Sequence, residues 1–122
     1  MTIFPKMRRN KYGAQKITVD GVSYDSKAEY RRYCELKLME RCGDIRDLKR
    51  QVRFELVPAQ YDKDTGKKLE SPITYVADFV YRKTDTNERV IEDVKGHRTR
   101  EYIMKRKLML WLYDYRIEEV RA

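Results

Sequence analysis

The sequence predicts one domain of the mixed α/β class, in which two helices alternate with strands. Three observations support this class: two stretches that carry helix start signals, two strand-like segments joined by a polar turn, and a length of 122 residues, enough for one domain with a modest core. The predicted core order is helix, strand, strand, strand, helix, strand. These segments are residues 26–42, 51–57, 75–82, 89–96, 99–113 and 116–120. No internal repeat or linker divides the chain, so we expect a flexible basic arm over 1–16 and a single domain over 17–122.

The first 16 residues are polar and basic, and they include Pro5 and Gly13. Segments of this composition often become ordered only on a phosphate backbone. Arg8, Arg9 and Lys11 are therefore candidate nucleic-acid contacts.

A short hairpin and a helix follow the arm. The turn pair Asp20-Gly21 predicts a hairpin over residues 17–24. A helix then begins at Ser26, and Gly43 is its expected stop signal.

Glu29 in this helix has two interpretations. As the third helical residue after Ser26, it completes a capping box and stabilises the helix locally. It also shares a helix face with Tyr33 and Leu36, so its carboxylate caps the inward stripe and can point into the interior. Spacing alone favours the cap, and both interpretations can hold in part.

A half-buried strand is predicted over residues 51–57, where Val52, Phe54 and Leu56 alternate with polar residues. A proline ends this strand. The polar segment 58–72 that follows predicts an exposed excursion between strands.

Residues 75–82 and 89–96 are predicted to form a β-hairpin, because both are rich in β-branched and aromatic residues and the connection between them favours a turn. A symmetric turn of two or four residues places Asp78 directly opposite Asp93. Facing Cβ atoms in an antiparallel pair are roughly 4.5–5.5 Å apart, and like charges at that distance repel each other.

Strand alternation also places Lys95 on the same face as Asp93, whereas Glu92 points to the other face. Two opposed carboxylates beside an ammonium group are unfavourable in a plain sheet, but they suit a divalent cation bound by oxygen ligands. The alternative is an asymmetric loop, which would shift the register by one residue and leave Asp78 and Asp93 as solvated charges on opposite faces.

The second helix, residues 99–113, has a basic N-terminal half. Its predicted packing surface consists of Ile103, Met104, Leu108, Leu110, Trp111 and Leu112. Its basic residues are candidate phosphate contacts, each with a solvated surface charge as the alternative. These candidates are Arg98, Arg100, Lys105 and Arg106. Residues 116–120 alternate weakly and predict the last strand.

The formal net charge is +8, and the positive excess lies in two segments, residues 1–17 and 95–107. Two basic segments on either side of an acidic cluster favour a polyanionic partner such as nucleic acid. A merely basic, soluble surface is the alternative. Cys34 and Cys42, eight residues apart on one predicted helix, are too far apart for a disulfide. Too few cysteine and histidine residues are present for structural zinc, and no signal peptide or membrane span is recognisable, so we expect a cytoplasmic protein.

The segment order and the motifs Ala77-Asp78 and Asp93-Val94-Lys95 resemble the PD-(D/E)XK nuclease superfamily, with alanine where the superfamily name has proline. Glu29 resembles the additional glutamate that several members carry in the first helix. Over nearly the whole chain, the sequence also resembles a phage- and prophage-encoded family of uncharacterised domains. The shared blocks are Asn10-Lys11-Tyr12-Gly13, Asp25-Ser26-Lys27-Ala28-Glu29, Val76-Ala77-Asp78-Phe79 and Ile91-Glu92-Asp93-Val94-Lys95-Gly96.

The resemblance implies a restriction-endonuclease-like core of order αβββαβ with a Mg²⁺ site, at which Mn²⁺ can substitute. Asp78, Asp93 and the main-chain carbonyl of Val94 would bind one ion, and Glu29 would complete that site or bind a second ion. Lys95 would orient or help deprotonate the attacking water. The resemblance thus shifts the interpretation of Glu29 from cap towards ligand.

We therefore expect a metal-dependent DNA endonuclease, structure-specific for branched or junction DNA such as a Holliday junction, acting in phage replication or recombination inside the bacterial host. Cutting a symmetric substrate would require two active sites, so we expect a homodimer. We expect neither a membrane partner nor a small-molecule cofactor. Two alternatives stay open. One is a non-catalytic nucleic-acid-binding or recombination accessory protein on the same fold, and the other is an RNA-processing nuclease with the same centre.

Overall fold

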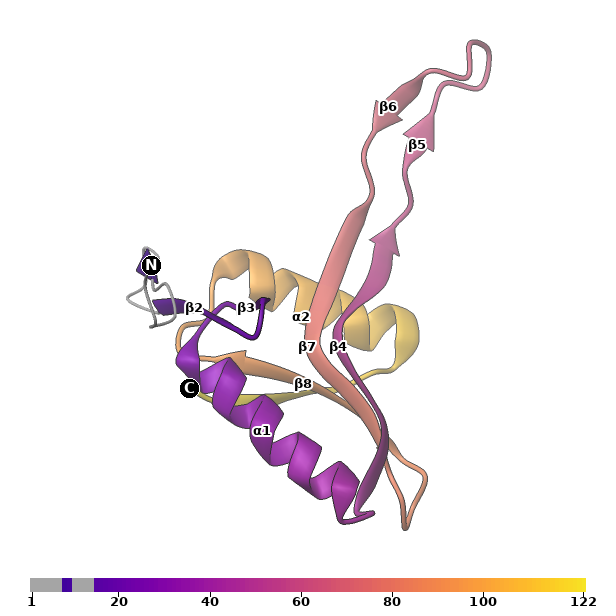
Figure 1. Cartoon of the computed structure of the whole chain (residues 1–122). Coiled ribbons are helices and arrows are strands. Elements are labelled where there is room, and N and C mark those ends of the chain that lie inside the picture. The colour runs from indigo at the N-terminus through magenta and orange to yellow at the C-terminus, as the bar shows by residue number, and fades with distance from the viewer. Residues whose placement is uncertain (1–7, 10–14) are drawn as a thin grey trace.

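The computed structural model of this chain describes residues 8–9 and 15–122, with the main chain alone for Arg8, Arg9 and Gln15. The described part has mixed α and β structure, as the sequence predicts, with two helices and a four-stranded mixed sheet (Figure 1). The elements are β1 (Arg8–Arg9), β2 (Gln15–Val19), β3 (Val22–Tyr24), α1 (Lys27–Arg41), β4 (Ile45–Val57), β5 (Gln60–Tyr61), β6 (Lys68–Glu70), β7 (Ile73–Lys83), β8 (Arg89–Lys95), α2 (Arg100–Tyr113) and β9 (Ile117–Arg121).

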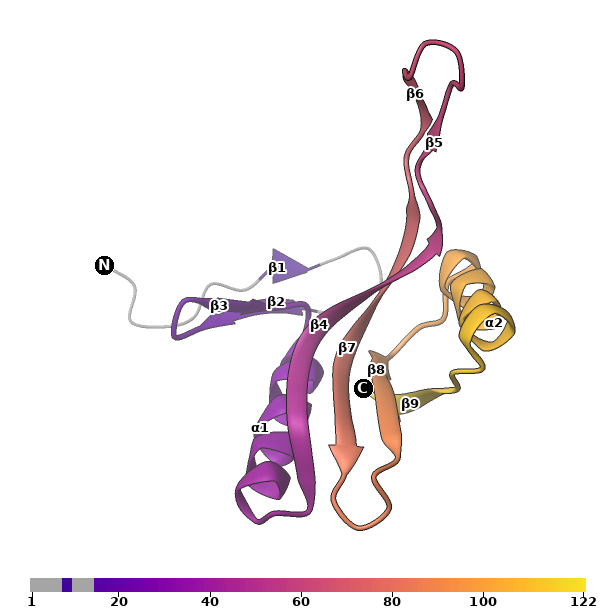
Figure 2. The same cartoon turned by 90° about the vertical axis from the view of Figure 1, so that its right-hand side faces the viewer.

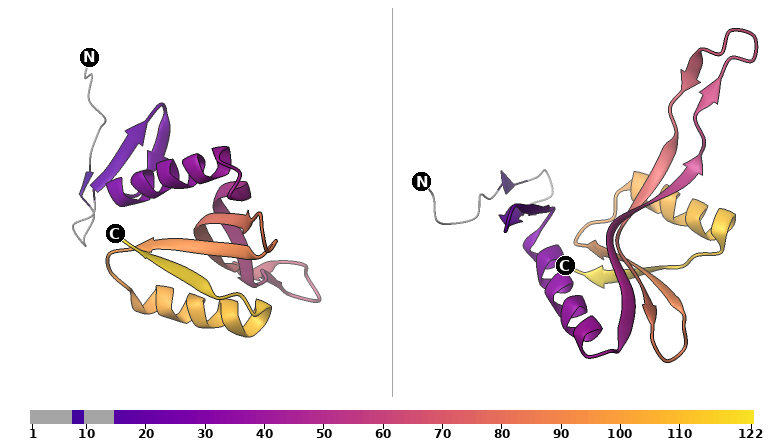
Figure 3. Two further views of the ribbon diagram at one scale, coloured as in Figure 1. Left: turned by 90° about the horizontal axis from the view of Figure 1, so that it is seen from below. Right: turned by 45° about the vertical axis from the view of Figure 1, so that its right-hand side comes forward.

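The main sheet has the strand order β4-β7-β8-β9. Its first three strands are antiparallel neighbours, whereas β9 pairs parallel to β8. A parallel pair needs a crossover connection, and α2 supplies it between these two strands. The helices α1 and α2 lie on opposite sides of the sheet (Figure 3).

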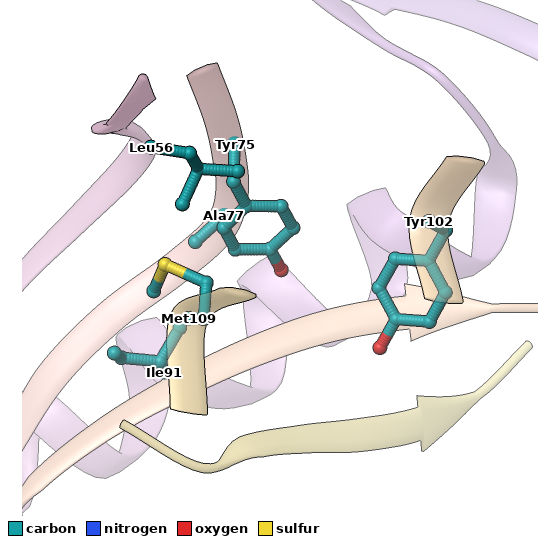
Figure 4. Packing of buried hydrophobic residues seen from close by; sticks show 6 residues of the cluster. All are labelled: Leu56, Tyr75, Ala77, Ile91, Tyr102 and Met109. Carbon is teal, nitrogen blue, oxygen red and sulfur yellow. The ribbon is translucent and has the colours of Figure 1, made fainter. Parts of the chain in front are cut away.

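Each face of the sheet has its own hydrophobic cluster. Beside α1, the buried residues are Leu36, Ile45, Phe79, Tyr81 and Val90. Beside α2, the buried residues are Leu56, Tyr75, Ala77, Ile91, Tyr102 and Met109 (Figure 4). The sheet is therefore covered by a helix and a hydrophobic cluster on each face.

Both helices begin at the residues that the sequence predicts. The Ser26 hydroxyl accepts a hydrogen bond from the Glu29 main-chain N–H at 3.0 Å, and the Thr99 hydroxyl accepts one from the Tyr102 N–H at 3.1 Å. These side chains satisfy main-chain donors that the first turn of a helix leaves unpaired. At the other end of α2, Asp114 adopts a left-handed conformation with a φ of 57°, which ends the helix.

The strand β4 begins at Ile45, six residues before the predicted start at residue 51. The segment 45–50 is rich in charged residues, so it lacks a clear alternating pattern. Pairing with β7 decides its conformation, since Ile45 pairs with Lys83 at the far end of the hairpin. A register shift between Arg46 and Lys49 further obscures the pattern of this segment.

The predicted polar excursion, residues 58–72, extends the β4–β7 ribbon. The short strands β5 and β6 pair within it, and the ribbon projects well beyond the rest of the molecule (Figures 1 and 2). We call residues 58–72 the projecting arm. None of its residues is buried.

At the N-terminal end, β2 and β3 form the predicted hairpin around Asp20-Gly21. The segment predicted as a flexible arm contributes β1, which pairs with β2, and Lys11 lies outside the described residues. Both cysteines are free, as their spacing predicts. Among the described helices, none has the length and apolar character that crossing a membrane requires.

Candidate active site

The hairpin of β7 and β8 has the predicted symmetric register. Phe79 pairs with Glu92 and Arg82 pairs with Arg89. The next step of this register brings Asp78 towards Asp93, at the point where the regular pairing ends. There the Asp78 carboxylate accepts a hydrogen bond from the Val94 main-chain N–H, with an Oδ2···N distance of 2.8 Å.

Neighbouring residues of β8 point to opposite faces, as alternation predicts. The Lys95 ammonium lies 3.1 Å from Asp93 Oδ1, on the side of α2. Glu92 points towards α1, where Arg32 donates to both of its carboxylate oxygens at 2.8 and 2.7 Å. The predicted placement of these three side chains is therefore confirmed.

The four predicted catalytic side chains line one cavity of about 440 Å³. They come from three elements: Glu29 from α1, Asp78 from β7, and Asp93 and Lys95 from β8. Only 2% of Glu29 and 3% of Asp93 is exposed to solvent. Residues far apart in the sequence thus place three carboxylates and one ammonium around a shared space.

The two interpretations of Glu29 are both partly correct. Its main-chain N–H binds Ser26, and its Oε2 accepts a hydrogen bond from the Asp25 main-chain N–H at 2.8 Å, which is a local capping arrangement. Its Oε1 points to the cavity side, 2.9 Å from the Gln51 amide nitrogen and 3.6 Å from the Arg50 guanidinium. Burial raises the pKa of this carboxyl group, although the bond from Asp25 partly offsets that effect.

Asp78 lies at the centre of the acidic groups. Burial raises the pKa of its carboxyl group to about 8, and the neighbouring charges of Asp93 and Glu29 act in the same direction. The hydrogen bond from Val94 and the charge of Lys95 oppose this rise. The two neighbouring carboxylates and the burial of Asp78 therefore disfavour a negative charge on this group.

Two tyrosines hold the Asp93–Lys95 pair in place. The Tyr75 hydroxyl donates to Asp93 Oδ2 at 2.5 Å, and burial raises the pKa of this tyrosine, with a further contribution from Asp93. The Lys95 ammonium lies 4.1 Å from the centroid of the Tyr102 ring, a cation–π contact. Neither tyrosine is identifiable from sequence spacing, because each reaches the site from a different element.

The structure adds Asp25 and Gln51 to the residues that sequence reasoning found. The carboxylate oxygens of Asp25, Glu29 and Asp78 lie within 4.8 Å of one another, whereas Asp93 is not part of this set. Asp25 directly precedes the capping residue of α1. It belongs to a block that the chain shares with the family it resembles, but its sequence position did not predict a ligand role. Gln51 lies inside β4, and nothing in its local sequence distinguishes it.

The donor set fits a hard divalent cation. It consists of carboxylate oxygens, and a carboxylate has about four lone-pair sites, so each of these groups can bind an ion while it keeps its present hydrogen bonds. Two of the predicted ligands, Glu29 and Asp78, belong to the set that includes Asp25. For Val94, the structure shows the main-chain N–H bound to Asp78.

The side chains predicted to contact nucleic acid differ in whether the structure pairs them with a carboxylate. Arg98 and Arg106 both pair with Glu119 of β9, with shortest N···O distances of 3.0 and 3.6 Å. Lys105 pairs with Glu101 at 3.0 Å. Arg100 is exposed. The side chains of Arg8 and Arg9 are not described, so the structure does not place them at the cavity.

One helical face of α2 is exposed along its whole length. It starts beside Thr99, which lines the cavity, and ends near the base of the projecting arm (Figure 1). We call this face the α2 outer stripe, and it consists of Arg100, Met104, Lys107 and Trp111. Met104 is 63% exposed and Trp111 is 85% exposed, so the prediction that both belong to the packing surface of this helix is wrong.

Comparisons with known proteins give a family for the chain. The model of a protein family described as "Protein of unknown function (DUF1064)" matches residues 9–122. No curated protein and no solved structure matches the chain.

Proposed function

We propose that this chain, which belongs to the DUF1064 family, is a metal-dependent nuclease that hydrolyses phosphodiester bonds in DNA. One observation carries the proposal: Glu29, Asp78, Asp93 and Lys95 come from three elements and line one cavity. Buried carboxylates that face one another destabilise a protein unless a cation or proton offsets their charge.

The strand order supports this proposal. The elements α1, β4, β7, β8, α2 and β9 occur in this order along the chain, with β5 and β6 inserted between β4 and β7. We propose that these six elements correspond to the αβββαβ core of a restriction-endonuclease-like fold. The β4–β7–β8 meander brings Asp78 and Asp93 to one end of the sheet, and α1 brings Glu29 there from one face.

Asp78, Asp93 and Glu29 would hold the ion, with Asp25 as a further carboxylate within reach of two of them. A bound Mg²⁺ or Mn²⁺ would polarise the phosphate and make water more acidic. Lys95, fixed between Asp93 and the Tyr102 ring, would orient the attacking water and offset charge on the phosphoryl oxygens. The oxygen of that water forms the new bond to phosphorus and its proton passes to solvent. The bond from phosphorus to O3′ breaks and O3′ takes up a proton, which leaves a 5′-phosphate and a 3′-hydroxyl.

The proposed path of the DNA runs from the cavity along the α2 outer stripe. Arg100 and Lys107 are exposed cations on it, and they suit phosphate contacts that set affinity without reading sequence. Arg98, Lys105 and Arg106 flank this path, and their carboxylate partners Glu119 and Glu101 hold them in position.

The proposed substrate is branched or junction DNA in phage replication or recombination within the bacterial host. A symmetric junction has two equivalent strands to cut, so the proposed active form is a homodimer with two cavities. Sedimentation at equilibrium tests this, since a complex that contains two 14.8 kDa chains for each junction is expected when junction DNA is bound.

The decisive experiment is a cleavage panel with linear duplex, flap, four-way junction, single-stranded DNA and RNA, each incubated with Mg²⁺, with Mn²⁺ or with EDTA. We expect metal-dependent cleavage that is fastest on a branched substrate. Asp93→Asn and Lys95→Ala should each reduce the cleavage rate by about 100-fold or more. Binding of the same DNA in EDTA should change by less than about threefold, because neither residue lies on the outer stripe.

Matched controls are Glu118→Gln and Lys83→Ala. Both residues are exposed and lie on strands of the same sheet, outside the cavity. Both variants should cleave at the rate of the unaltered protein. DNA binding with no cleavage of any substrate would favour a non-catalytic nucleic-acid-binding protein, and selective cleavage of RNA would favour an RNA-processing nuclease.

A further inference from the structure

Gln51 has an unusual backbone conformation for its position. Its φ is 51°, in the left-handed region, although it lies in the interior of β4. The other described non-glycine residues with positive φ are Asp or Asn, and they lie at turns, at a strand irregularity or at a helix end. Asp and Asn tolerate this region better than glutamine does, so Gln51 carries a backbone cost that residues at functional sites often carry.

The strand pairing is interrupted at the same point. Arg50 pairs with Phe79 and Val52 pairs with Ala77, but Gln51 and Asp78 form no ladder pair between them. On either side of this point, the inward residues of β4 pack against different helices: Leu48 joins the cluster beside α1, and Leu56 belongs to the cluster beside α2. The strands β4 and β7 curve as they pass between the two helices (Figure 2).

The Gln51 side chain connects two acids of the cavity. Its amide nitrogen lies 2.9 Å from Glu29 Oε1 and 3.3 Å from Asp78 Oδ1. Both partners are carboxylates, and the NH₂ group offers two donors, so it must face them. The amide thus bridges a carboxylate of α1 and a carboxylate of β7, which no main-chain pairing connects.

We propose that Gln51 is a positioning residue for the metal site. This inference rests on the proposed function and extends it to a residue of β4. The amide holds Glu29 and Asp78 close together before an ion arrives, and each carboxylate retains lone pairs for the ion. Hydrogen bonds that orient ligands in this way typically contribute about 10–100-fold to metal affinity. Without the bridge, the two carboxyl groups are free to separate, and metal binding must bring them together again.

The alternative is that Gln51 matters only for its backbone, as the residue that permits the bend in β4. Two substitutions separate these roles. Gln51→Gly and Gln51→Ala both remove the amide, but they differ in backbone preference, because glycine adopts a positive φ without strain and alanine does not. A backbone role predicts that glycine is harmless and alanine is harmful, whereas a positioning role predicts that both are harmful to the metal site.

The experiment is a calorimetric titration of the full-length, metal-free protein with Mn²⁺, together with thermal unfolding in EDTA. We expect both variants to bind Mn²⁺ about tenfold more weakly than the unaltered protein. In EDTA, the glycine variant should unfold at a higher temperature than the alanine variant, so that loss of affinity does not follow loss of stability. Gln60→Ala, a matched change on the exposed projecting arm, should leave the Mn²⁺ affinity unchanged.

Three results would overturn the inference. Unchanged Mn²⁺ affinity in the glycine variant would assign Gln51 to the backbone alone. Tighter binding in both variants would show that the amide competes with the ion. If the unaltered protein binds no Mn²⁺, both the proposed metal site and this role for Gln51 are wrong. In the first two results the unaltered protein still binds Mn²⁺, so the proposed metal site stands and only the role of Gln51 is wrong.

Discussion

Asp78 has the most strongly perturbed carboxyl group at the site, since burial and two neighbouring acids raise its pKa to about 8 from an ordinary value of 3.8. Between these two pH values, the folded metal-free protein keeps a proton on Asp78 that the unfolded chain has released. The contribution of this group to stability is therefore greatest below about pH 4 and is lost as the pH rises to about 8.

Asp78→Asn should remove this dependence. We expect the variant to gain stability relative to the unaltered protein as the pH rises from 4 to 8, and to exceed it by more than about 1 kcal/mol at pH 8, since one pKa unit corresponds to about 1.4 kcal/mol. Urea unfolding in EDTA at several pH values measures the difference. Parallel stability curves for the two proteins would contradict the assigned environment of Asp78.

On the opposite face of β8, Glu92 is 2% exposed and depends on Arg32 for charge compensation. The Tyr81 hydroxyl also donates to it. Arg32→Ala would leave this carboxylate buried without its cation. Removing one partner of a buried ion pair costs about 3–5 kcal/mol, so we expect a loss of that size in the free energy of unfolding.

Chemical denaturation measures this loss, and Arg31→Ala is the matched control. Arg31 is the exposed neighbour on α1, and a surface change of this kind typically alters stability by less than about 0.5 kcal/mol. Equal stability of the two variants would show that Arg32 does not compensate Glu92 in solution.

At the scale of elements, the side chains of β8 have different roles on the two faces of the sheet. Glu92 contributes to a structural ion pair on the α1 side, whereas Asp93 and Lys95 contribute to the cavity. The sequence predicts this division, because strand alternation is a local property of extended backbone. The partners on each face are not local, since Arg32, Tyr75 and Tyr102 come from three other elements.

The α2 outer stripe leads to a prediction about DNA binding. Arg100→Ala and Lys107→Ala should each lower the slope of log affinity against log salt concentration by about one, because each removes one phosphate contact. Trp111→Ala should weaken binding of single-stranded or branched DNA by about 1–3 kcal/mol, the typical contribution of a ring that stacks on a base.

Fluorescence anisotropy over a range of salt concentrations measures both effects, and Arg41→Ala near the C-terminal end of α1 is the control. That residue is exposed and basic, but it lies at the opposite end of α1 from Glu29 and does not line the cavity. If Arg41→Ala has the same effect as Arg100→Ala, binding is non-specific attraction to a protein of net charge +8, and the stripe is not the path.

At the scale of the whole molecule, the projecting arm is separable from the core. None of the residues 58–72 is buried, and Val57 pairs with Ile73 at its base. Replacing the arm by Asn-Gly, a two-residue hairpin turn, should therefore change the free energy of unfolding by less than about 1 kcal/mol. Denaturant unfolding and the cleavage panel together test the variant. A stable but inactive protein would assign the arm to contact with a substrate or partner. A decrease of more than about 2 kcal/mol in the free energy of unfolding would show that the arm supports the fold.

The sequence by itself determined the element types, the start of both helices, the register of the β7–β8 hairpin and the faces of Asp93 and Lys95. Helix caps, turns and strand alternation depend on residues close together in the chain, so they can be predicted from local sequence. The tertiary structure decided the rest: the true start of β4, the paired arm strands, the exposure of Trp111, and the arrival of Asp25, Gln51, Tyr75 and Tyr102 at the site. These depend on which segments pack together, because the positions of distant side chains follow from the packing of whole elements and not from any short stretch of chain.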